Sequence, residues 1–555
     1  MNSVDKIVIG DVITLDPANP FAEAVAVAGN RIAAAGSRKE MLALKTRDTR
    51  VFETGGTIIP GFNDTHAHMD TEGLRDRFPS LGRTRSIADV QARIKKLAQE
   101  TPRGEWIVTM PVGDEPFYFG GPAVLAERRM PNRVELDAAA PDHPVCILPP
   151  SGYWSLLPCY TALNSMGLQK NGLDRNSRPR VEGVELQRDD AGELTGILIE
   201  NNYPDSAQID LLPAVPRFSP LDRREAILRS IARYHEKGTT SVYEGHGCAP
   251  EVLDAYRDLW EEGALSMRMA LVVSPVWSTL EEAQRFMRDW LSHARGKGIG
   301  DSYLRIGGVF ISYGGEPTAA VAAQANPADL GWSCYVKQAN DPREFEELCR
   351  EAARRDLRVH TIAIDQLEQI VPILERVNEA TPIAHRRWVL EHMSYARESD
   401  LQRLRALGIG VTLIPDYHLW KVGTRFFSLD EANRELVAPA VQLEKLGVPF
   451  AGGTDNSPFN PLAVMRAMTT RRERTTGTVI GSGACVSVAS ALGAMTANGA
   501  WFTFEENIKG RIKPGFFADL AVLDGNPLRT PGEEMERLRC IATMSGGRFV
   551  FGMKN

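Results

Sequence analysis

The sequence predicts an α/β protein built on a distorted (β/α)8 barrel, with a small composite β-sandwich from both termini and a cap over the barrel mouth. Three observations lead to this prediction. Short apolar strands alternate with amphipathic helices from residue 221 onward, strand-like runs occur at both ends, and a long insertion separates the first barrel strand from the rest. Such alternation is typical of α/β folds.

The barrel is predicted over residues 59–507. The helix-like stretch LDRREAILRSIARYHEKG precedes the apolar run TTSVYEG, and the same order recurs as far as VPFAGGTD. Counting the strand that leads into HAH as the first gives eight strands. Buried strands separated by helices indicate a parallel sheet, and eight of them favour a closed barrel. A doubly wound open sheet is the alternative.

The two ends of the chain share a different pattern. Residues 1–58 contain KIVIGDVITL and EAVAVAGNRIAAAG, and residues 508–555 contain GFFADLAVLDG and RCIATMSGGRFVFG. β-Branched runs broken by Gly and Asn indicate short antiparallel strands. We expect both ends to pair into one β-sandwich, with two unrelated β appendages as the alternative.

Residues from about 75 to 215 form the expected insertion. This stretch holds three strand candidates, WIVTMPVG, HPVCILPPSG and GELTGILIE, with many Pro and Gly residues between them. An insertion after the first strand would lie over the carboxyl-end mouth of the barrel, where barrel enzymes keep their active sites. We therefore expect a cap that shapes a pocket and excludes water.

The composition excludes several classes of partner. The 555 residues carry a net charge of -7, which offers no basic surface to nucleic acid or anionic lipid. The chain has no run of about 20 apolar residues and no signal-peptide pattern at its start. Seven scattered cysteines without a CxxC pair indicate a reducing compartment. We expect a cytoplasmic protein that binds a small molecule, with homo-oligomer formation left open.

Polar residues gather at the carboxyl ends of the predicted strands. His66 and His68 project from the same side of the first strand because side chains alternate along it. His360, His392 and Asp455 fall at the ends of the fifth, sixth and eighth strands. These five residues are the predicted metal ligands, since imidazole and carboxylate suit Zn²⁺, Mn²⁺ or Fe²⁺. Asp455 and His392 are also the predicted catalytic residues, because a carboxylate beside activated water can move its proton.

The chain resembles the amidohydrolase superfamily of metal-dependent hydrolases, and within it the YtcJ-like amidohydrolase-3 branch. The resemblance is carried by GTIIPGFNDTHAHMD, LDAAAPDHPVCIL, GELTGILIE, VHTIAIDQLEQIV, RRWVLEHMSYA, GTDNSPFNPL and GRIKPGFFADLAVLDGNPL. These segments span nearly the whole chain. The resemblance implies a distorted barrel with one or two metal ions, and hydrolysis of substituted formamides or other amides.

One departure from the family pattern concerns the number of metal ions. Where relatives carry a lysine that bridges two metals and a nearby Asp, this chain has Phe310 and Gly314. Two cations about 3.5 to 4 Å apart repel each other without an anionic bridge, so we expect one ion per chain, most simply zinc. Glu244 is the candidate for a substitute bridge between two ions. Alternation along the strand should turn Glu391 away from the face that His392 occupies.

The predicted substrate pocket is lined by Tyr153, Trp154, Phe310 and His418, which favour an apolar or aromatic substrate. His246 is interpreted as an ordinary packing residue. The predicted activity is metal-dependent cleavage of a C–N bond in an amide or formamide-like molecule. A deaminase, a cyclic amidohydrolase or an esterase on the same scaffold is the alternative, and an inactive scaffold subunit is the alternative of another class.

Overall fold

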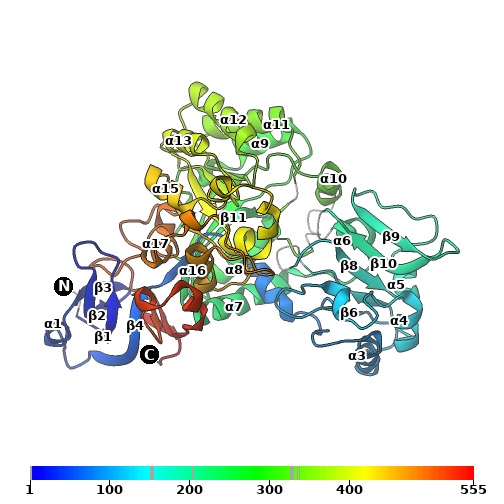
Figure 1. The fold of residues 1–555 in the computed structure, drawn as a ribbon, viewed down its shortest axis with the longest axis horizontal. Coiled ribbons are helices and arrows are strands. Elements are labelled where there is room, and N and C mark those ends of the chain that lie inside the picture. The colour runs from blue at the N-terminus through cyan, green and yellow to red at the C-terminus, as the bar shows by residue number, and fades with distance from the viewer. Residues whose placement is uncertain are drawn as a thin grey trace.

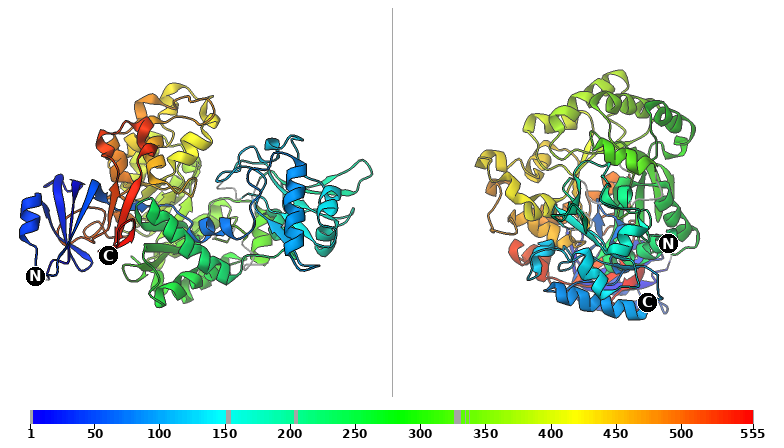
Figure 2. Two further views of the ribbon diagram at one scale, coloured as in Figure 1. Left: turned by 90° about the horizontal axis from the view of Figure 1, so that it is seen from below. Right: turned by 90° about the vertical axis from the view of Figure 1, so that its right-hand side faces the viewer.

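The structure is a computed structural model that describes residues 3–150, 155–202, 206–325, 331–333, 335–336 and 338–554. It has three parts, arranged along the long axis of the molecule (Figure 1). The barrel lies in the middle, a β-sheet that contains both termini lies at one end, and the inserted segment lies at the other. Figure 2 shows the same order of parts from below.

The barrel consists of eight parallel strands joined in sequence order. They are β5 (Phe62–Asp64), β11 (Thr239–Cys248), β12 (Arg268–Val273), β14 (Leu304–Phe310), β15 (Val359–Ile362), β16 (Val389–Glu391), β17 (Gly410–Leu413) and β18 (Phe450–Gly452). The short strand β13 (Ile299–Gly300) pairs with β14 outside this order. Between β18 and β5, the Thr65 amide donates to the Gly452 carbonyl at 3.3 Å, which nearly closes the sheet. The predicted eight-stranded barrel is confirmed.

Helices surround the barrel and bury their apolar faces against its strands. The main ones are α7 (Pro220–Glu236), α8 (Pro250–Glu261), α9 (Leu280–Asp289), α11 (Pro342–Arg354), α12 (Leu367–Ala380), α13 (Glu398–Ala406), α15 (Ala440–Leu446), α16 (Pro461–Thr470) and α17 (Val488–Ala494). Their starts are fixed locally: Ser219 and Asp222 form a capping box at α7, where Pro220 occupies the first turn. Among the described residues, no helix is long and apolar enough to cross a membrane.

The two ends of the chain form one seven-stranded sheet. Its strands are, in spatial order, β21 (Arg548–Phe551), β20 (Cys540–Ser545), β19 (Leu520–Leu523), β4 (Arg50–Pro60), β1 (Lys6–Ile13), β2 (Phe21–Ala28) and β3 (Arg31–Gly36). The antiparallel pairing of β19 with β4 sets Ala521 opposite Ile59 and joins the two ends. Val8 and Ile7, neighbours on β1, are both buried in separate apolar clusters. The predicted composite β unit is confirmed.

The insertion is a five-stranded sheet with helices. The strand order is β6 (Ile107–Thr109), β7 (Val145–Ile147), β8 (Cys159–Leu163), β10 (Leu194–Glu200) and β9 (Val184–Arg188), packed with α3 (Ile87–Glu100), α4 (Arg133–Ala139), α5 (Ser165–Lys170) and α6 (Ser206–Leu211). It contacts the loops at the barrel mouth. The Trp332 indole donates to the Pro149 carbonyl at 3.2 Å, and the Phe117 and Trp420 ring centroids lie 5.3 Å apart.

Candidate metal centre

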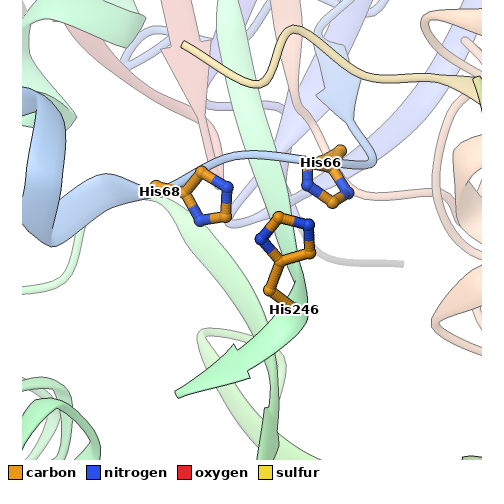
Figure 3. A group of neighbouring side chains, drawn as sticks. All are labelled: His66, His68 and His246. Carbon is orange, nitrogen blue, oxygen red and sulfur yellow. The ribbon is translucent and has the colours of Figure 1, made fainter. Parts of the chain in front are cut away.

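Five buried side chains meet where the barrel strands end. His66 and His68 follow β5, His246 lies near the end of β11, His392 follows β16 and Asp455 follows β18. Figure 3 shows His66, His68 and His246 turned toward one another. The carboxyl ends of parallel strands share one rim, so this convergence is a direct consequence of the fold.

These side chains form two overlapping groups of potential metal ligands. One group is His66, His68 and His246, and the other is His66, His392 and Asp455. Within each group, the ligand atoms lie within 4.8 Å of one another. His68 Nε2 is 3.1 Å from Asp455 Oδ1, and His392 Nε2 is 3.0 Å from His66 Nε2. The structure thus brings together four of the five predicted ligands.

Buried carboxylates orient both histidines of the HAH motif. His66 Nδ1 lies 3.0 Å from Glu391 Oε2, and His68 Nδ1 lies 3.2 Å from Glu244 Oε2. The opposite nitrogens, His66 Nε2 and His68 Nε2, face Asp455 Oδ1 at 3.6 and 3.1 Å. A carboxylate behind a histidine fixes the tautomer and raises the basicity of the ligating nitrogen, as in carboxylate–histidine–zinc triads.

The segment after β18 holds Asp455 in an uncommon backbone conformation. Asp455 and Asn456 have φ angles of +52° and +54°, in the left-handed region. The Asp455 amide donates to the His66 carbonyl at 2.7 Å, and the Asn456 side chain bonds both the amide and the carbonyl of His68. Strained backbone that its surroundings hold in place is typical of functional sites. These bonds tie β18 to the HAH segment.

Glu391 and His392 contact opposite nitrogens of His66. Glu391 lies 3.0 Å from Nδ1, and His392 Nε2 lies 3.0 Å from Nε2. His392 directly follows β16 and has a φ of +57°, which ends the regular alternation of side chains along the strand. That Glu391 turns away from the face of His392 stays a prediction. Glu391 also accepts a hydrogen bond from the Thr412 hydroxyl, which anchors the carboxylate behind His66.

His360 lies beside the ligand groups and, within the described residues, belongs to neither of them. The Tyr243 hydroxyl lies 2.6 Å from His360 Nδ1, and Glu391 Oε1 lies 3.6 Å from the same nitrogen. Burial lowers the pKa of His360 to about 4. The structure therefore places His360 beside one oxygen of Glu391, and the other oxygen of Glu391 contacts His66.

Glu244, the candidate bridging ligand, is held behind His68. Its Oε1 accepts hydrogen bonds from the Met69 amide and the Tyr256 hydroxyl, both at 2.7 Å, while Oε2 contacts His68 Nδ1. Neither ligand group among the described residues includes Glu244. Glu244 thus contacts Nδ1 of His68, whereas Nε2 of the same ring faces Asp455. A carboxylate in this position orients the histidine ring.

Two of the four predicted pocket residues, Phe310 and His418, lie near the histidine cluster. The Phe310 ring is buried, with its centroid 6.1 Å from that of His246, and the His418 ring lies 5.9 Å from His392. His418 belongs to a π-helix, Asp416–Lys421, that directly follows β17. Such helices are rare and are frequent at functional sites. Tyr153 and Trp154 lie outside the described residues.

The electrostatics of the cluster suit a divalent cation. Burial lowers the pKa of both His66 and His392 to about 3, so both imidazoles are neutral at physiological pH and offer a lone pair. Burial alone would raise the pKa of Asp455, but His392, His68 and His66 hold it at about 2. Neutral imidazoles around one ionised carboxylate are the donor set that zinc and similar ions prefer.

Sequence reasoning missed His246. Its ring centroid lies 4.4 Å from that of His66, 4.8 Å from that of His68 and 4.9 Å from that of His392. The sequence-based interpretation as an ordinary packing residue did not foresee that His246 belongs to one of the two groups of potential metal ligands. The available signal was local: in EGHGC the histidine stands between two glycines near a strand end, where backbone irregularity is expected.

Known proteins share this architecture. The model of the Amidohydrolase family matches residues 54–551. YtcJ of Bacillus subtilis is 24% identical over 513 residues, covering 90% of this chain and 89% of its own. The N-substituted formamide deformylase of Arthrobacter pascens is 24% identical over 571 residues, covering 98% and 97%. An uncharacterized metal-dependent hydrolase from Pyrococcus horikoshii superposes with a TM-score of 0.67 at 20% identity, covering 95% and 99%. The chain belongs to the Amidohydrolase family.

Proposed function

We propose that this protein is a metal-dependent hydrolase that cleaves the C–N bond of a small amide or formamide. One observation carries the proposal: two buried carboxylates lie behind the HAH histidines, whose Nε2 atoms both face Asp455. A bound cation would give these converging nitrogen and oxygen atoms a common partner. The similarity to an N-substituted formamide deformylase over 98% of this chain supports the substrate class.

The proposed cofactor is one divalent metal ion, with zinc favoured and Mn²⁺ or Fe²⁺ as alternatives. His66, His68 and Asp455 would hold the ion, and His392 lies close enough to share it. A divalent ion at such a site polarises a carbonyl group and lowers the pKa of a coordinated water to about 7. The neutral imidazoles and the single carboxylate would leave a net positive centre that attracts a carbonyl oxygen.

Asp455 is the proposed proton carrier. Its Oδ1 faces His66 and His68, whereas Oδ2 lies 3.8 Å from His392 Nε2. Among the described residues, no group donates a hydrogen bond to Oδ2. This oxygen is therefore placed to take a proton from water and pass it to the leaving nitrogen. His392 would hydrogen-bond the reacting oxygen or bind the metal directly.

Aromatic side chains border the site and support an apolar or aromatic substituent on the substrate. The Tyr335 ring centroid lies 5.0 Å from that of His246, and the Tyr417 ring lies 6.0 Å from His392. Phe310 lies behind Tyr335, with 5.6 Å between their ring centroids. Such rings offer large apolar contact area with defined orientation. We therefore expect N-benzyl formamides to exceed short aliphatic ones in kcat/KM.

The test is a substrate screen with protein loaded with one equivalent of Zn²⁺. The panel contains N-benzylformamide, N-butylformamide, the matching acetamides, phenyl acetate and an aminated heterocycle. Turnover of a formamide or amide is expected, with kcat about 10²–10⁴-fold lower in Asp455→Asn because a proton carrier is removed. Metal-loaded protein that hydrolyses only the ester or only the heterocycle would overturn the proposed substrate class.

A further inference from the structure

We infer that His246 is a ligand of the metal ion, and that it supplies the donor that the sequence-based prediction assigned to His360. The inference rests on the proposed function, because it requires a metal centre at the HAH motif. It changes which strands build that centre. Strand β11 contributes a ligand, whereas β15 contributes a residue that acts through Glu391.

The position of His246 is the first argument. Its ligand atom lies within 4.8 Å of those of both HAH histidines (Figure 3). Its ring also lies close to those of His66, His68 and His392. The His246 and His392 rings are nearly parallel, with an interplanar angle of 15°. All four histidines are buried. A neutral imidazole carries one N–H donor and one nitrogen lone pair. Four imidazoles packed this closely can therefore direct several lone pairs to one metal ion.

The backbone of β11 is irregular where it presents His246. The pairing with β12 shifts register between Glu244 and Cys248. A Cβ atom at Gly245 would lie 2.4 Å from Glu391 Oε1, so only glycine lets that carboxylate approach the strand. Gly247 has a φ of +78°, and a Cβ there would lie 3.0 Å from the Phe310 Cβ. The two glycines thus let the strand end turn His246 toward the site.

The donor atoms also limit the number of ions. His66 belongs to both ligand groups, but its Nδ1 contacts Glu391, which leaves Nε2 as the nitrogen that faces the site. One imidazole lone pair binds one ion. The two groups share His66 Nε2 and therefore describe one centre. Phe310 offers no donor to this centre, whereas His246 offers one.

His360 is arranged for a different role. Its Nδ1 lies close to both the Tyr243 hydroxyl, at 2.6 Å, and Glu391 Oε1, at 3.6 Å. Glu391 in turn contacts His66 Nδ1 through its other oxygen. His360 is therefore a positioning residue. Its loss should disturb the orientation of His66 without removing a donor from the metal.

The experiment compares His246→Asn with His360→Asn in the full chain. Both variants are treated with a chelator, reloaded with Zn²⁺ or Co²⁺, and checked for folding by near-ultraviolet circular dichroism. Zn²⁺ affinity is measured by competition with a chromophoric chelator, and the Co²⁺ form by its visible absorption spectrum. His246→Asn should weaken Zn²⁺ binding by more than about 100-fold, because loss of outer partners alone costs about 10–100-fold. His360→Asn should stay within that range and keep the wild-type Co²⁺ spectrum.

A second variant keeps the test informative if His246→Asn does not fold. His246→Cys places a thiolate donor at the same position, and a ligating thiolate adds a charge-transfer band in the near ultraviolet to the Co²⁺ form. Appearance of this band supports the inference. Its absence in folded, cobalt-loaded protein overturns it, as does wild-type affinity in His246→Asn. The proposed function fails separately, if wild-type protein binds no metal or if metal-loaded wild type hydrolyses no amide.

Discussion

Two buried polar clusters, one at each end of the barrel, differ in the kinds of side chain that they bring together. At the amino end of the strands, Arg268 bonds Asp519 through two nitrogens at 2.7 and 3.1 Å, and Lys509 lies 2.7 Å from Glu505. Both of these buried cations face an anion. At the carboxyl end, four buried imidazoles and the Asp455 carboxylate converge into two overlapping groups of potential metal ligands.

This difference suggests a structural role for the cluster at the amino end and a functional role for the cluster at the carboxyl end. The ion pairs at the amino end are complete within the protein, and they join the barrel to the composite sheet, because Asp519 directly precedes β19. The cluster at the carboxyl end is the candidate site for a metal ion. In barrel enzymes the carboxyl-end loops carry the chemistry, and the opposite end contributes stability. The following variants test whether metal binding depends on the carboxyl-end cluster alone and whether the amino-end cluster affects stability alone.

The largest expected effect is on metal retention. His66→Ala combined with His68→Ala removes two donors from one centre, so the purified protein should retain no metal after dialysis and should lose its hydrolytic activity. The fold should survive, because the buried ion pairs at the amino end of the barrel do not involve the metal centre. Elemental analysis and circular dichroism measure the two outcomes. Undiminished metal content in the double variant would show that the centre lies elsewhere.

The next effect is on stability at the opposite end. Arg268→Met leaves Asp519 buried without its cation, and breaking a buried pair in this way costs about 3–5 kcal/mol. The metal content should remain at the wild-type value. The matched control is Arg288→Met, whose solvent-exposed pair with Asp289 should contribute little to stability. Denaturant unfolding measures both variants, and an Arg268→Met protein that loses its metal while folded would show that the two ends are coupled.

A pH-dependent effect comes from His235 at the end of α7. Its ring nitrogens contact the Thr239 carbonyl and the Ser266 hydroxyl, and burial lowers its pKa to about 4. Above pH 6.5 the His235 imidazole is neutral in both the folded and the unfolded chain, so its contribution to the free energy of unfolding is fully present. As the pH falls toward 4, the unfolded chain is protonated first, and stability falls by about 3 kcal/mol.

The measurement is the melting temperature of wild type and His235→Asn between pH 7 and pH 4.5, with metal content held equal. The wild-type value should fall more steeply than that of the variant, whatever their difference at pH 7. Parallel pH profiles would contradict the assignment. This test also separates a packing histidine from the metal-centre histidines, since His235→Asn should leave the Zn²⁺ affinity unchanged.

Strand-end reasoning found most of the site because parallel strands place their last residues on one rim. His66, His68, His392 and Asp455 all follow recognisable apolar runs, and the structure brings them together. The β pairing of the chain ends was also accessible, because alternation and turn residues are local signals.

The missed features depend on backbone irregularity. His246 stands beyond the point where the ladder of β11 shifts register, so a regular strand pattern gives no reason to aim it at the site. Directly after β16, His392 has a positive φ, which alternation along a strand does not anticipate. His360 is at a strand end as predicted, but its ring is directed by Tyr243 and Glu391, which are contacts from other strands. Long-range contacts of this kind are not encoded in a local pattern.

The smallest expected effect distinguishes orienting groups from ligands. Glu391→Gln and Glu244→Gln each keep the shape of the side chain but remove the charge behind one HAH histidine. Each variant should weaken Zn²⁺ binding by about 10–100-fold while one equivalent still binds at saturating metal. The two carboxylates contact different histidines, so their effects on affinity should multiply in the double variant. If Glu244 instead bridged two ions, Glu244→Gln would lower the stoichiometry by a full equivalent, and Glu391→Gln would not. A titration that follows both affinity and stoichiometry therefore decides whether the carboxylates lie behind the histidines, as the geometry indicates, or within the coordination shell.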